Sequence, residues 1–390
     1  MFKKWIFIIG LALIFSLAIS SLASAGGEHQ WKVAFDPVYY GYEPVNFDEW
    51  SGGAQILTME VFRDSLYLCV ISLNGGQLYR SPDGAAWQAV GEPGLGIDIL
   101  GCSDMTVYHD MLYVTSFFAP YILRSADGLT FEIVSDPEQG SPVLSPGKLE
   151  EFKGMLYVSS SDEDGYAELW RSKSGDAGTW EPAGDLGEYL MGNDFKPYKG
   201  MLYVSIIDPN YLTVKILRSR DSLVWNVVVD DAFQSVSQDG TNNQGGDFYV
   251  HQGKLYFTTF NWSLNPVDPE GDWIPNGGRI YTTRNGTDWE ILMQGGFDDP
   301  NNVYVQGLSS YLGDLYGWTE NWETGCEVWK SHTGEVGTWM QVNQDGFGFG
   351  PRFGVSQGDT AQVIFKDELY IAGWDTSEAF LGMVWKLAHP

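Results

Sequence analysis

The chain has 390 residues, and its 22 Lys and Arg against 51 Asp and Glu give a formal net charge of -29. Such acidity argues against a nucleic-acid partner or an anionic membrane surface, because both are bound through clustered cations. With 44% hydrophobic and 15% aromatic residues, the chain is also too apolar to remain an unfolded polyelectrolyte. Its many glycines and aromatic residues predict short strands joined by tight turns.

The first 25 residues have the pattern of a secretory signal peptide. Lys3 and Lys4 precede an apolar run over residues 5–19, and Ala23-Ser24-Ala25 matches a small-x-small cleavage site. An uncleaved anchor is the alternative. No later segment reaches the length of an apolar membrane span, so we expect no membrane insertion after cleavage and a secreted or periplasmic protein that begins at Gly26.

A short pattern then recurs seven times along the chain. It consists of an apolar residue, a turn containing Gly, Asp or Ser, and a Leu-Tyr pair that is usually followed by another apolar residue. The seven Leu-Tyr pairs are Leu66-Tyr67, Leu112-Tyr113, Leu156-Tyr157, Leu202-Tyr203, Leu255-Tyr256, Leu315-Tyr316 and Leu369-Tyr370.

A second pattern follows each of the first six pairs. It is an apolar strand ending in a basic residue and Ser or its equivalent, then a Gly/Asp turn, then an aromatic residue. The aromatic residues are Trp87, Phe131, Trp180, Trp225, Trp289 and Trp339. Together the two patterns place four strands in each unit, and a four-stranded unit of about 40–60 residues repeated in series is typical of a β-propeller. The seven units are called blades 1 to 7 in chain order.

The seventh unit lacks its fourth strand, because the chain ends at Pro390 shortly after the third. The N-terminal segment Trp31-Lys32-Val33-Ala34-Phe35 resembles the start of the other fourth strands, such as Trp87-Gln88-Ala89-Val90. We therefore predict an all-β fold: a single seven-bladed propeller over residues 26–390, closed by an N-terminal strand in the last blade. Closure removes sheet edges that would otherwise pair with other chains. A division into two domains is the alternative.

The turn Ser81-Pro82-Asp83-Gly84-Ala85-Ala86-Trp87 and its copies resemble the Asp-box, or bacterial neuraminidase repeat, although several copies differ by one residue in length. This resemblance implies a sialidase-like fold, which serves enzymes, receptors and assembly factors alike. Sialidases of this family grip a sugar carboxylate with three arginines, and here only Arg279 and Arg352 fall outside the repeat turns on the face where ligands are expected. Sialidase activity is therefore not expected.

The topology sorts the connections between two faces of the disc. The turns between strands one and two and between strands three and four share one face, which we call the turn face. The connections between strands two and three and between blades form the other, the loop face, which holds the long and irregular segments. Ligand-binding residues concentrate on variable loops held by a rigid scaffold, so we assign binding to the loop face.

Aromatic and acidic residues gather in the loop-face segments of blades 5 to 7. Tryptophan beside carboxylate suits sugars, because the indole stacks on the ring face and the acid accepts hydroxyl hydrogen bonds. The candidate ligand-binding residues are Trp262, Trp273, Asp272, Arg279, Trp318, Glu320, Trp322, Glu323, Arg352, Trp374 and Asp375.

Three interpretations of these residues remain open. The tryptophans could simply cap the apolar ends of the blades. They could recognise a glycan or a cell-surface protein without chemistry, which is the leading prediction, with no catalytic residue, no metal and no cofactor, and with a monomeric protein. In the third, a glycoside hydrolase or polysaccharide lyase would use paired carboxylates drawn from Glu320, Glu323, Asp272 and Asp375.

Two smaller features also leave alternatives. Asp162-Glu163-Asp164-Gly165 is either a solvated turn or part of a Ca²⁺ site, although it lacks the longer ligand pattern of a calcium loop. Cys69, Cys102 and Cys326 allow one disulfide in an oxidising compartment, with one thiol left over.

Overall fold

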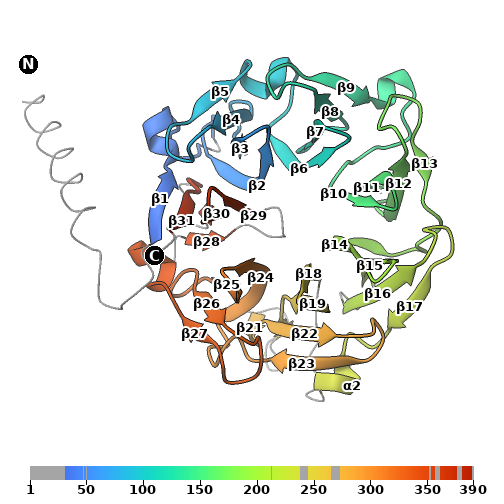
Figure 1. The fold of residues 1–390 in the computed structure, drawn as a ribbon, viewed down its shortest axis with the longest axis vertical. Helices are drawn as coiled ribbons and strands as arrows, with labels where there is room; N and C mark the ends of the chain where they lie inside the picture. The colour runs from blue at the N-terminus through green and yellow to red at the C-terminus, as the bar shows by residue number, and fades with distance from the viewer. Residues whose placement is uncertain are drawn as a thin grey trace, which may run out of the picture.

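Seven antiparallel sheets form a ring around a central axis (Figure 1). The computed structural model describes residues 31–388 apart from 47, 50, 212, 238–244, 265–272, 351–352, 356–360 and 376–379. Each of the first six blades has four strands in order from the centre outward, as the repeat predicted. The seven-bladed propeller is therefore confirmed.

The strands of each blade follow one another from the centre of the ring to its rim. The inner strands are β2 (Gln55–Phe62), β6 (Cys102–Tyr108), β10 (Leu149–Phe152), β14 (Leu190–Tyr198), β18 (Phe248–His251), β24 (Asn302–Tyr311) and β29 (Gln362–Phe365). The second strands each begin one residue before a Leu-Tyr pair. They are β3 (Ser65–Ile71), β7 (Met111–Ser116), β11 (Met155–Ser161), β15 (Met201–Asp208), β19 (Lys254–Thr259), β25 (Asp314–Asn321) and β30 (Glu368–Asp375).

The outer half of most blades is shorter than the inner half. The third strands are β4 (Gln77–Ser81), β8 (Ile122–Ser125), β12 (Ala167–Ser172), β16 (Thr213–Ser219), β22 (Arg279–Thr283), β26 (Val328–Ser331) and β31 (Val384–Leu387). The rim strands are β5 (Gln88–Val90), β9 (Glu132–Ser135), β13 (Glu181–Pro182), β17 (Asn226–Val229), β23 (Trp289–Met293), β27 (Met340–Gln341) and β1 (Trp31–Phe35).

The N-terminal strand closes the ring. β1 pairs antiparallel with β31, from Trp31 opposite Leu387 to Phe35 opposite Val384, so it supplies the fourth strand that the seventh unit lacks. Phe35 is fully buried, and its ring stacks on Tyr40 with 4.6 Å between centroids and packs edge-on against Trp87 of blade 1. The predicted closure is confirmed.

The two repeated sequence patterns contact each other between neighbouring blades. The tyrosine of one blade's Leu-Tyr pair packs on the glycine of the next blade's Asp-box-like turn: a Cβ at Gly128 would lie 2.1 Å from the hydroxyl of Tyr67, and one at Gly84 would lie 2.0 Å from that of Tyr370. Both glycines have positive φ, +73° and +70°, which L side chains rarely adopt. The contact between Tyr370 and Gly84 repeats this joint between the last blade and the first.

Buried polar groups link the inner strands. Asp104 in β6 accepts a hydrogen bond from the backbone N–H of Leu149 in blade 3, at 2.7 Å. Asp194 in β14 accepts one from Phe248 of blade 5, at 2.6 Å, and forms an ion pair with Lys148 of blade 3. Because an unpaired buried charge is costly, these partners let the charged residues sit at the centre of the fold.

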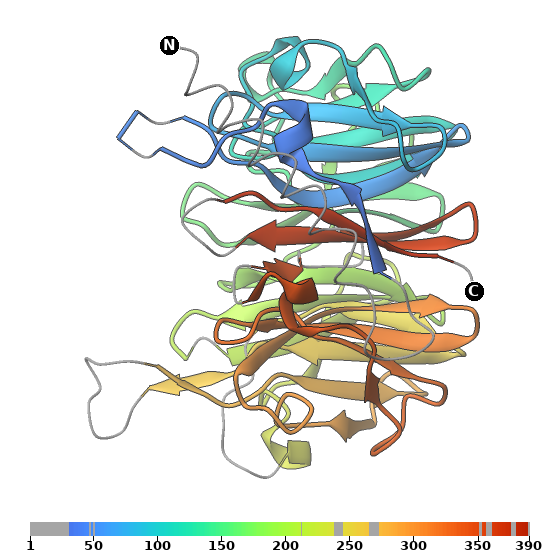
Figure 2. The same ribbon diagram turned by 90° about the vertical axis from the view of Figure 1, so that its left-hand side faces the viewer.

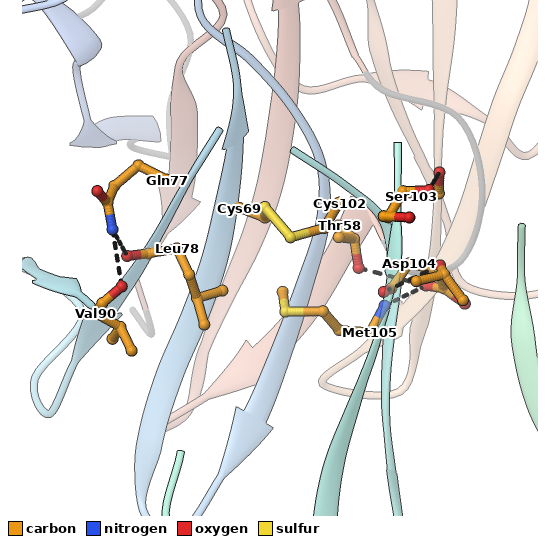
Figure 3. Close-up of a disulfide and its surroundings, with 11 residues drawn as sticks. Thr58, Cys69, Gln77, Leu78, Val90, Cys102, Ser103, Asp104 and Met105 are labelled. Atoms are coloured by element: carbon orange, nitrogen blue, oxygen red, sulfur yellow. Dashed lines mark hydrogen bonds between the residues drawn. A yellow bond between two sulfur atoms is a disulfide. The ribbon is translucent and has the colours of Figure 1, made fainter. Parts of the chain in front are cut away.

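A disulfide joins the first two blades (Figure 3). Cys69 in β3 and Cys102 at the start of β6 are bonded, with their Cα atoms 5.8 Å apart, and both are buried. Beside them Thr58 donates to Asp104, so a covalent and a polar link join the same two blades. The remaining thiol, Cys326, is buried and free.

Seen edge-on, the disc has two unlike faces (Figure 2). The connection from β1 to β2 and the hairpin of β20 (Trp262–Leu264) with β21 (Trp273–Pro275) project from the same face. The remaining elements also lie in the connections of that face: the short helices η1 (Pro37–Tyr40), η2 (Pro93–Gly96), η3 (Pro137–Gln139), α2 (Gln234–Ser237) and η4 (Asp345–Gly348), and the strand β28 (Phe353–Val355). None of the helices in the described ranges is both long and apolar enough to cross a membrane.

Candidate functional site

Exposed aromatic side chains lie on the loop face, spread over several blades. In the part of the chain that the structure describes, five Phe, Tyr or Trp side chains are strongly exposed, from 38% for Phe349 to 84% for Phe118. All five lie in connections between blades or between second and third strands: Tyr39, Phe118, Tyr211, Trp322 and Phe349. We call these five residues the aromatic crown.

The turn face exposes apolar side chains of another kind. Its exposed large hydrophobic residues are aliphatic throughout the described turns, namely Leu129, Leu223, Val224, Leu312 and Val336. The aromatic residues that follow these turns are buried or half-buried. Trp87, for example, is buried against the neighbouring blade, where it donates its indole N–H to the carbonyl of Ala34 at 2.8 Å. The two faces therefore differ in which ring surfaces a ligand can reach.

Phe118 illustrates how the crown is held. It lies between β7 and β8 with φ of +55°, an uncommon conformation for a bulky residue, and its ring meets that of Phe117 edge-on at 4.4 Å. The hydroxyl of Ser116 donates to the carbonyl of Ala119 at 2.6 Å and fixes the base of this turn. A strained aromatic residue held at a loop tip is a candidate for contact with a ligand.

Blade 6 places carboxylates beside a crown residue. Glu320, at the end of β25, accepts hydrogen bonds from the indole N–H of Trp322 and from the side-chain amide of Gln306, both at 2.6 Å. Burial raises the pKa of Glu320 above its ordinary value, and these two donors only partly oppose the shift. Trp322 is thus oriented by a partly buried acid while its ring stays exposed.

A second blade-6 acid also has a raised pKa. Burial raises the pKa of Glu327, which accepts hydrogen bonds from Asn302 at 2.7 Å and from the indole of Trp329 at 2.8 Å. The backbone N–H of Thr319 donates to the carbonyl of Glu327, so these two residues lie opposite each other on neighbouring strands and point to the same side of the sheet. Glu320 follows Thr319 in β25, and successive residues of a strand point to opposite sides. The two acids therefore lie on opposite sides of the blade-6 sheet and do not flank one cleft.

Three of the predicted residues occupy interior positions. Trp318 is fully buried between blades 6 and 7 with Leu369, because a Cβ at Gly307 on the facing strand would lie only 2.6 Å from the indole, and glycine leaves that space free. Arg279 is buried within blade 5, and Asp375 is buried where it accepts the backbone N–H of Leu381 at 2.9 Å. The buried position of Trp318 agrees with the alternative in which the tryptophans cap the apolar ends of the blades.

The structure describes the side chains of some of the other predicted residues and not of the rest. Glu323 is exposed in the same loop as Trp322, and its backbone N–H donates to Asn321 at 2.9 Å. Asp272 and Arg352 lie outside the described residues. The structure places the backbones of Trp262, Trp273 and Trp374 in β20, β21 and β30, respectively, but does not describe their side chains. The structure thus brings together Glu320, Trp322 and Glu323.

The sequence prediction omitted four of the five crown residues: Tyr39, Phe118, Tyr211 and Phe349. A signal for them was present, because each lies outside the repeated strand patterns and within two residues of a Pro, Asn or Gly of a loop-face connection. None of the four has an adjacent acidic residue, so the pattern of aromatic beside acidic residues does not include them. Among the described side chains, no three His, Cys, Asp or Glu come together in a way that could hold a metal ion.

The turn-face aspartates accept hydrogen bonds from the backbone of their own turns. Asp83 accepts hydrogen bonds from the backbone N–H groups of Ala85 and Ala86, at 2.9 and 2.8 Å, and these bonds lower its pKa to about 2. The same arrangement lowers the pKa of Asp127 and of Asp221. Asp162, on the loop face, likewise accepts N–H groups of its own turn, those of Asp164 and Tyr166, at 2.9 and 2.8 Å.

No protein-family model and no curated protein sequence matches this chain. In structure it is similar to virginiamycin B lyase from Staphylococcus aureus, with a TM-score of 0.54 and 12% identity over 93% of this chain and 100% of that one. It is also similar to polysaccharide lyase Uly1, with a TM-score of 0.55 and 9% identity over 85% of this chain and 89% of that one. The WD40 domain of Neurospora crassa Pan2 gives 0.53 and 8% over 94% and 98%.

These neighbours include enzymes and a domain of the WD40 type, so the likeness defines the class of fold, a β-propeller, and no particular activity. Membership of the Asp-box family has no matching family model behind it and remains an expectation from the turn pattern.

Proposed function

We propose that this protein is an exported, non-catalytic propeller that binds glycans through the aromatic crown of its loop face. The observation that carries the proposal is where aromatic rings are exposed: among the described residues, all five exposed aromatic side chains lie on the loop face, and the exposed apolar residues of the described turns of the turn face are aliphatic. Exposed aliphatic residues such as Val38 and Leu144 occur on the loop face as well, so it is the aromatic residues that are confined to one face. Aromatic rings offer flat apolar surfaces with polar edges, which suit the apolar faces of sugar rings. A propeller that binds no ligand on its loop face is not expected to expose aromatic residues on that face alone.

The acids beside the crown support the same function. Glu320 and Glu323 lie within three residues of Trp322, and a carboxylate accepts hydrogen bonds from sugar hydroxyls. Glu320 also fixes the indole through its hydrogen bond, which lowers the entropy lost when a ligand stacks there. Blade 6 therefore combines a held aromatic platform with acceptor groups at its edge.

Export is proposed on two independent features. The N-terminal 25 residues carry the signal-peptide pattern, and they lie outside the described residues. The disulfide between Cys69 and Cys102 is of a kind that persists in oxidising compartments. A surface-exposed or extracytoplasmic setting is also where a glycan or a glycosylated partner would be met.

The alternative is an enzyme that acts on sugars through paired carboxylates. Its supporting observation is the raised pKa of Glu320 and of Glu327, a property of catalytic acids. Against it, these two glutamates face opposite sides of the blade-6 sheet, whereas acid/base catalysis needs two acids on either side of one bond. Binding without turnover is therefore the better-supported function.

A glycan array and a panel of chromogenic glycosides, both with purified residues 26–390, test the proposal together. We expect binding to a subset of glycans, weakened by Trp322→Ala, and no hydrolysis or elimination on the panel. Turnover that disappears in Glu320→Gln would contradict the non-catalytic function. Absence of binding to every glycan on the array would contradict glycan recognition itself.

A further inference from the structure

A cleft of about 370 Å³ lies at the loop-face end of β12 in blade 3, beside the connection that leads to blade 4. Its walls come from the loop between β11 and β12, from β12 itself, and from the connection leading from β13 to β14. The residues that matter for its chemistry are Tyr166, Trp170, Asp162, Glu168, Asp185 and Glu188. The volume falls in the range of small-molecule sites and accommodates a sugar ring.

The cleft exists because β13 is only two residues long. It covers β12 at Trp170 and Arg171 and then ends, so the chain leaves the edge of β12 at Gly184, whose φ is +79°. Two backbone hydrogen bonds fix the borders of the opening: Ala183 donates to the carbonyl of Leu169, and Ala167 donates to that of Tyr189, both at 2.7 Å. The cleft is therefore built into the backbone and does not have to form when a ligand arrives.

Aromatic surface and hydrogen-bond acceptors share this cleft. Trp170 and Tyr166 are half-buried in its wall, and the indole N–H of Trp170 donates to Glu168 at 3.0 Å. One oxygen of Asp185 accepts the backbone N–H of Gly187 at 2.8 Å, which holds its carboxylate in place. The lining contains four carboxylates and no Lys, Arg or His.

We propose that this cleft is a subsite for one pyranose residue that carries no acidic group. The inference rests on the proposed glycan-binding function and adds the place and charge class of one sugar unit. The aromatic walls stack on the ring, and the carboxylates accept hydrogen bonds from hydroxyl or ammonium donors. An anionic sugar is repelled, because its carboxylate would enter a cleft that already holds four like charges and no cation.

Calorimetric titration of the exported chain with three probes tests this subsite: cellotetraose, the tetramer of glucosamine, and tetragalacturonate. We expect cellotetraose or the glucosamine tetramer to bind and tetragalacturonate to bind at least about tenfold more weakly. Tyr166→Ala should weaken binding of the preferred probe about tenfold by removing one wall. Glu168→Gln keeps an acceptor for Trp170 but removes a charge, so it should reduce the discrimination against tetragalacturonate.

The matched control is Glu163→Gln, because Glu163 is exposed in the same turn as Tyr166 and lies outside the cleft lining. It should bind like the parent protein, and thermal unfolding of all variants checks that each is folded. Equal affinity for the acidic and non-acidic probes, binding of none of the three, or unchanged affinity in both Tyr166→Ala and Glu168→Gln would overturn the subsite. Binding that survives these two changes but falls in Trp322→Ala would overturn only the subsite and leave the glycan-binding crown standing.

Discussion

The turn face and the loop face are built from the same seven repeats, yet they differ in what each repeat contributes. On the turn face the same joint recurs, with a tyrosine of one blade packed on a glycine of the next, as in Tyr67 with Gly128 and Tyr370 with Gly84. On the loop face the connections differ from blade to blade in length and sequence, and they carry the exposed aromatic residues. Repetition therefore marks the parts that hold the ring together, and departure from repetition marks the parts free to acquire a ligand.

The electrostatics follow the same division. Turn-face aspartates such as Asp83 accept backbone N–H groups and have lowered pKa values, so their charge stabilises the fold. In blade 6 the loop-face acids Glu320, which is partly buried, and Glu327, which is buried, have raised pKa values, so their ionised forms destabilise the folded state. Perturbed pKa values of this kind are common among functional groups.

The largest expected effect concerns the disulfide that ties blades 1 and 2 near the loop face, where the repeated turn-face joint does not reach. Replacing Cys69 and Cys102 together by Ala should lower the free energy of unfolding by about 3–4 kcal/mol, because the bond closes a loop of 33 residues in the unfolded chain. Urea unfolding measures this, with Cys326→Ala as the control for loss of a buried sulfur. A loss no larger than that of the control would mean that the bond adds nothing to stability.

A pair of glycine substitutions compares the two faces directly. Both Gly84 on the turn face and Gly165 on the loop face have positive φ, but a Cβ at Gly84 would clash with Tyr370 and one at Gly165 would meet nothing within 4 Å. Gly84→Ala should therefore cost about 2–4 kcal/mol, from backbone strain plus overpacking, and Gly165→Ala about 1 kcal/mol from strain alone. Equal losses in urea unfolding would show that the tyrosine–glycine joint does not set the stability of the ring.

A smaller effect should appear in the pH dependence of stability. The lowered pKa of Asp83 gives stability that is complete above its ordinary pKa of about 4 and is lost as the pH falls toward about 2, so the deficit of Asp83→Asn at pH 7 should shrink over that range. For Glu320 the sign is reversed, because a raised pKa makes its charge a cost that appears as the pH rises above about 4. Glu320→Gln should therefore be at least as stable as the parent at pH 7, with any gain fading near pH 4.

Thermal unfolding from pH 2 to pH 7 checks both expectations. A Glu320→Gln variant that is less stable than the parent at pH 7 would mean that its hydrogen bonds to Trp322 and Gln306 outweigh the cost of burying the charge.

The sequence was sufficient for the fold because the repeated patterns are local. Leu-Tyr pairs, Asp-box-like turns and the orphan strand Trp31–Phe35 each reveal a strand or turn from a few adjacent residues, and ring closure then follows by completing the last blade. The sequence did not reveal the contact between neighbouring blades that makes the two patterns recur. The contact between Tyr370 and Gly84 joins residues 286 positions apart, and no local pattern states that one packs on the other.

The candidate site was harder to predict because exposure depends on the neighbouring strand. Trp318 and Trp322 stand four residues apart in the same acidic segment, yet Trp318 is buried where Gly307 makes room for it and Trp322 lies at the surface. The cleft at the edge of β12 in blade 3 arises from the shortness of β13, and strand ends are poorly marked in the sequence. The residue types in the sequence therefore identified part of the loop-face site, but only the folded structure shows which of those side chains are buried.

The most direct test of the division between the two faces is the affinity of matched surface variants for a glycan that the parent protein binds. Tyr211→Ala and Trp322→Ala remove exposed crown residues, and Leu129→Ala and Val336→Ala remove exposed turn-face residues, Val336 being about as exposed as Tyr211. We predict that each crown variant loses about tenfold in affinity and that neither turn-face variant changes it measurably. Loss of affinity in the turn-face variants with none in the crown variants would contradict the account.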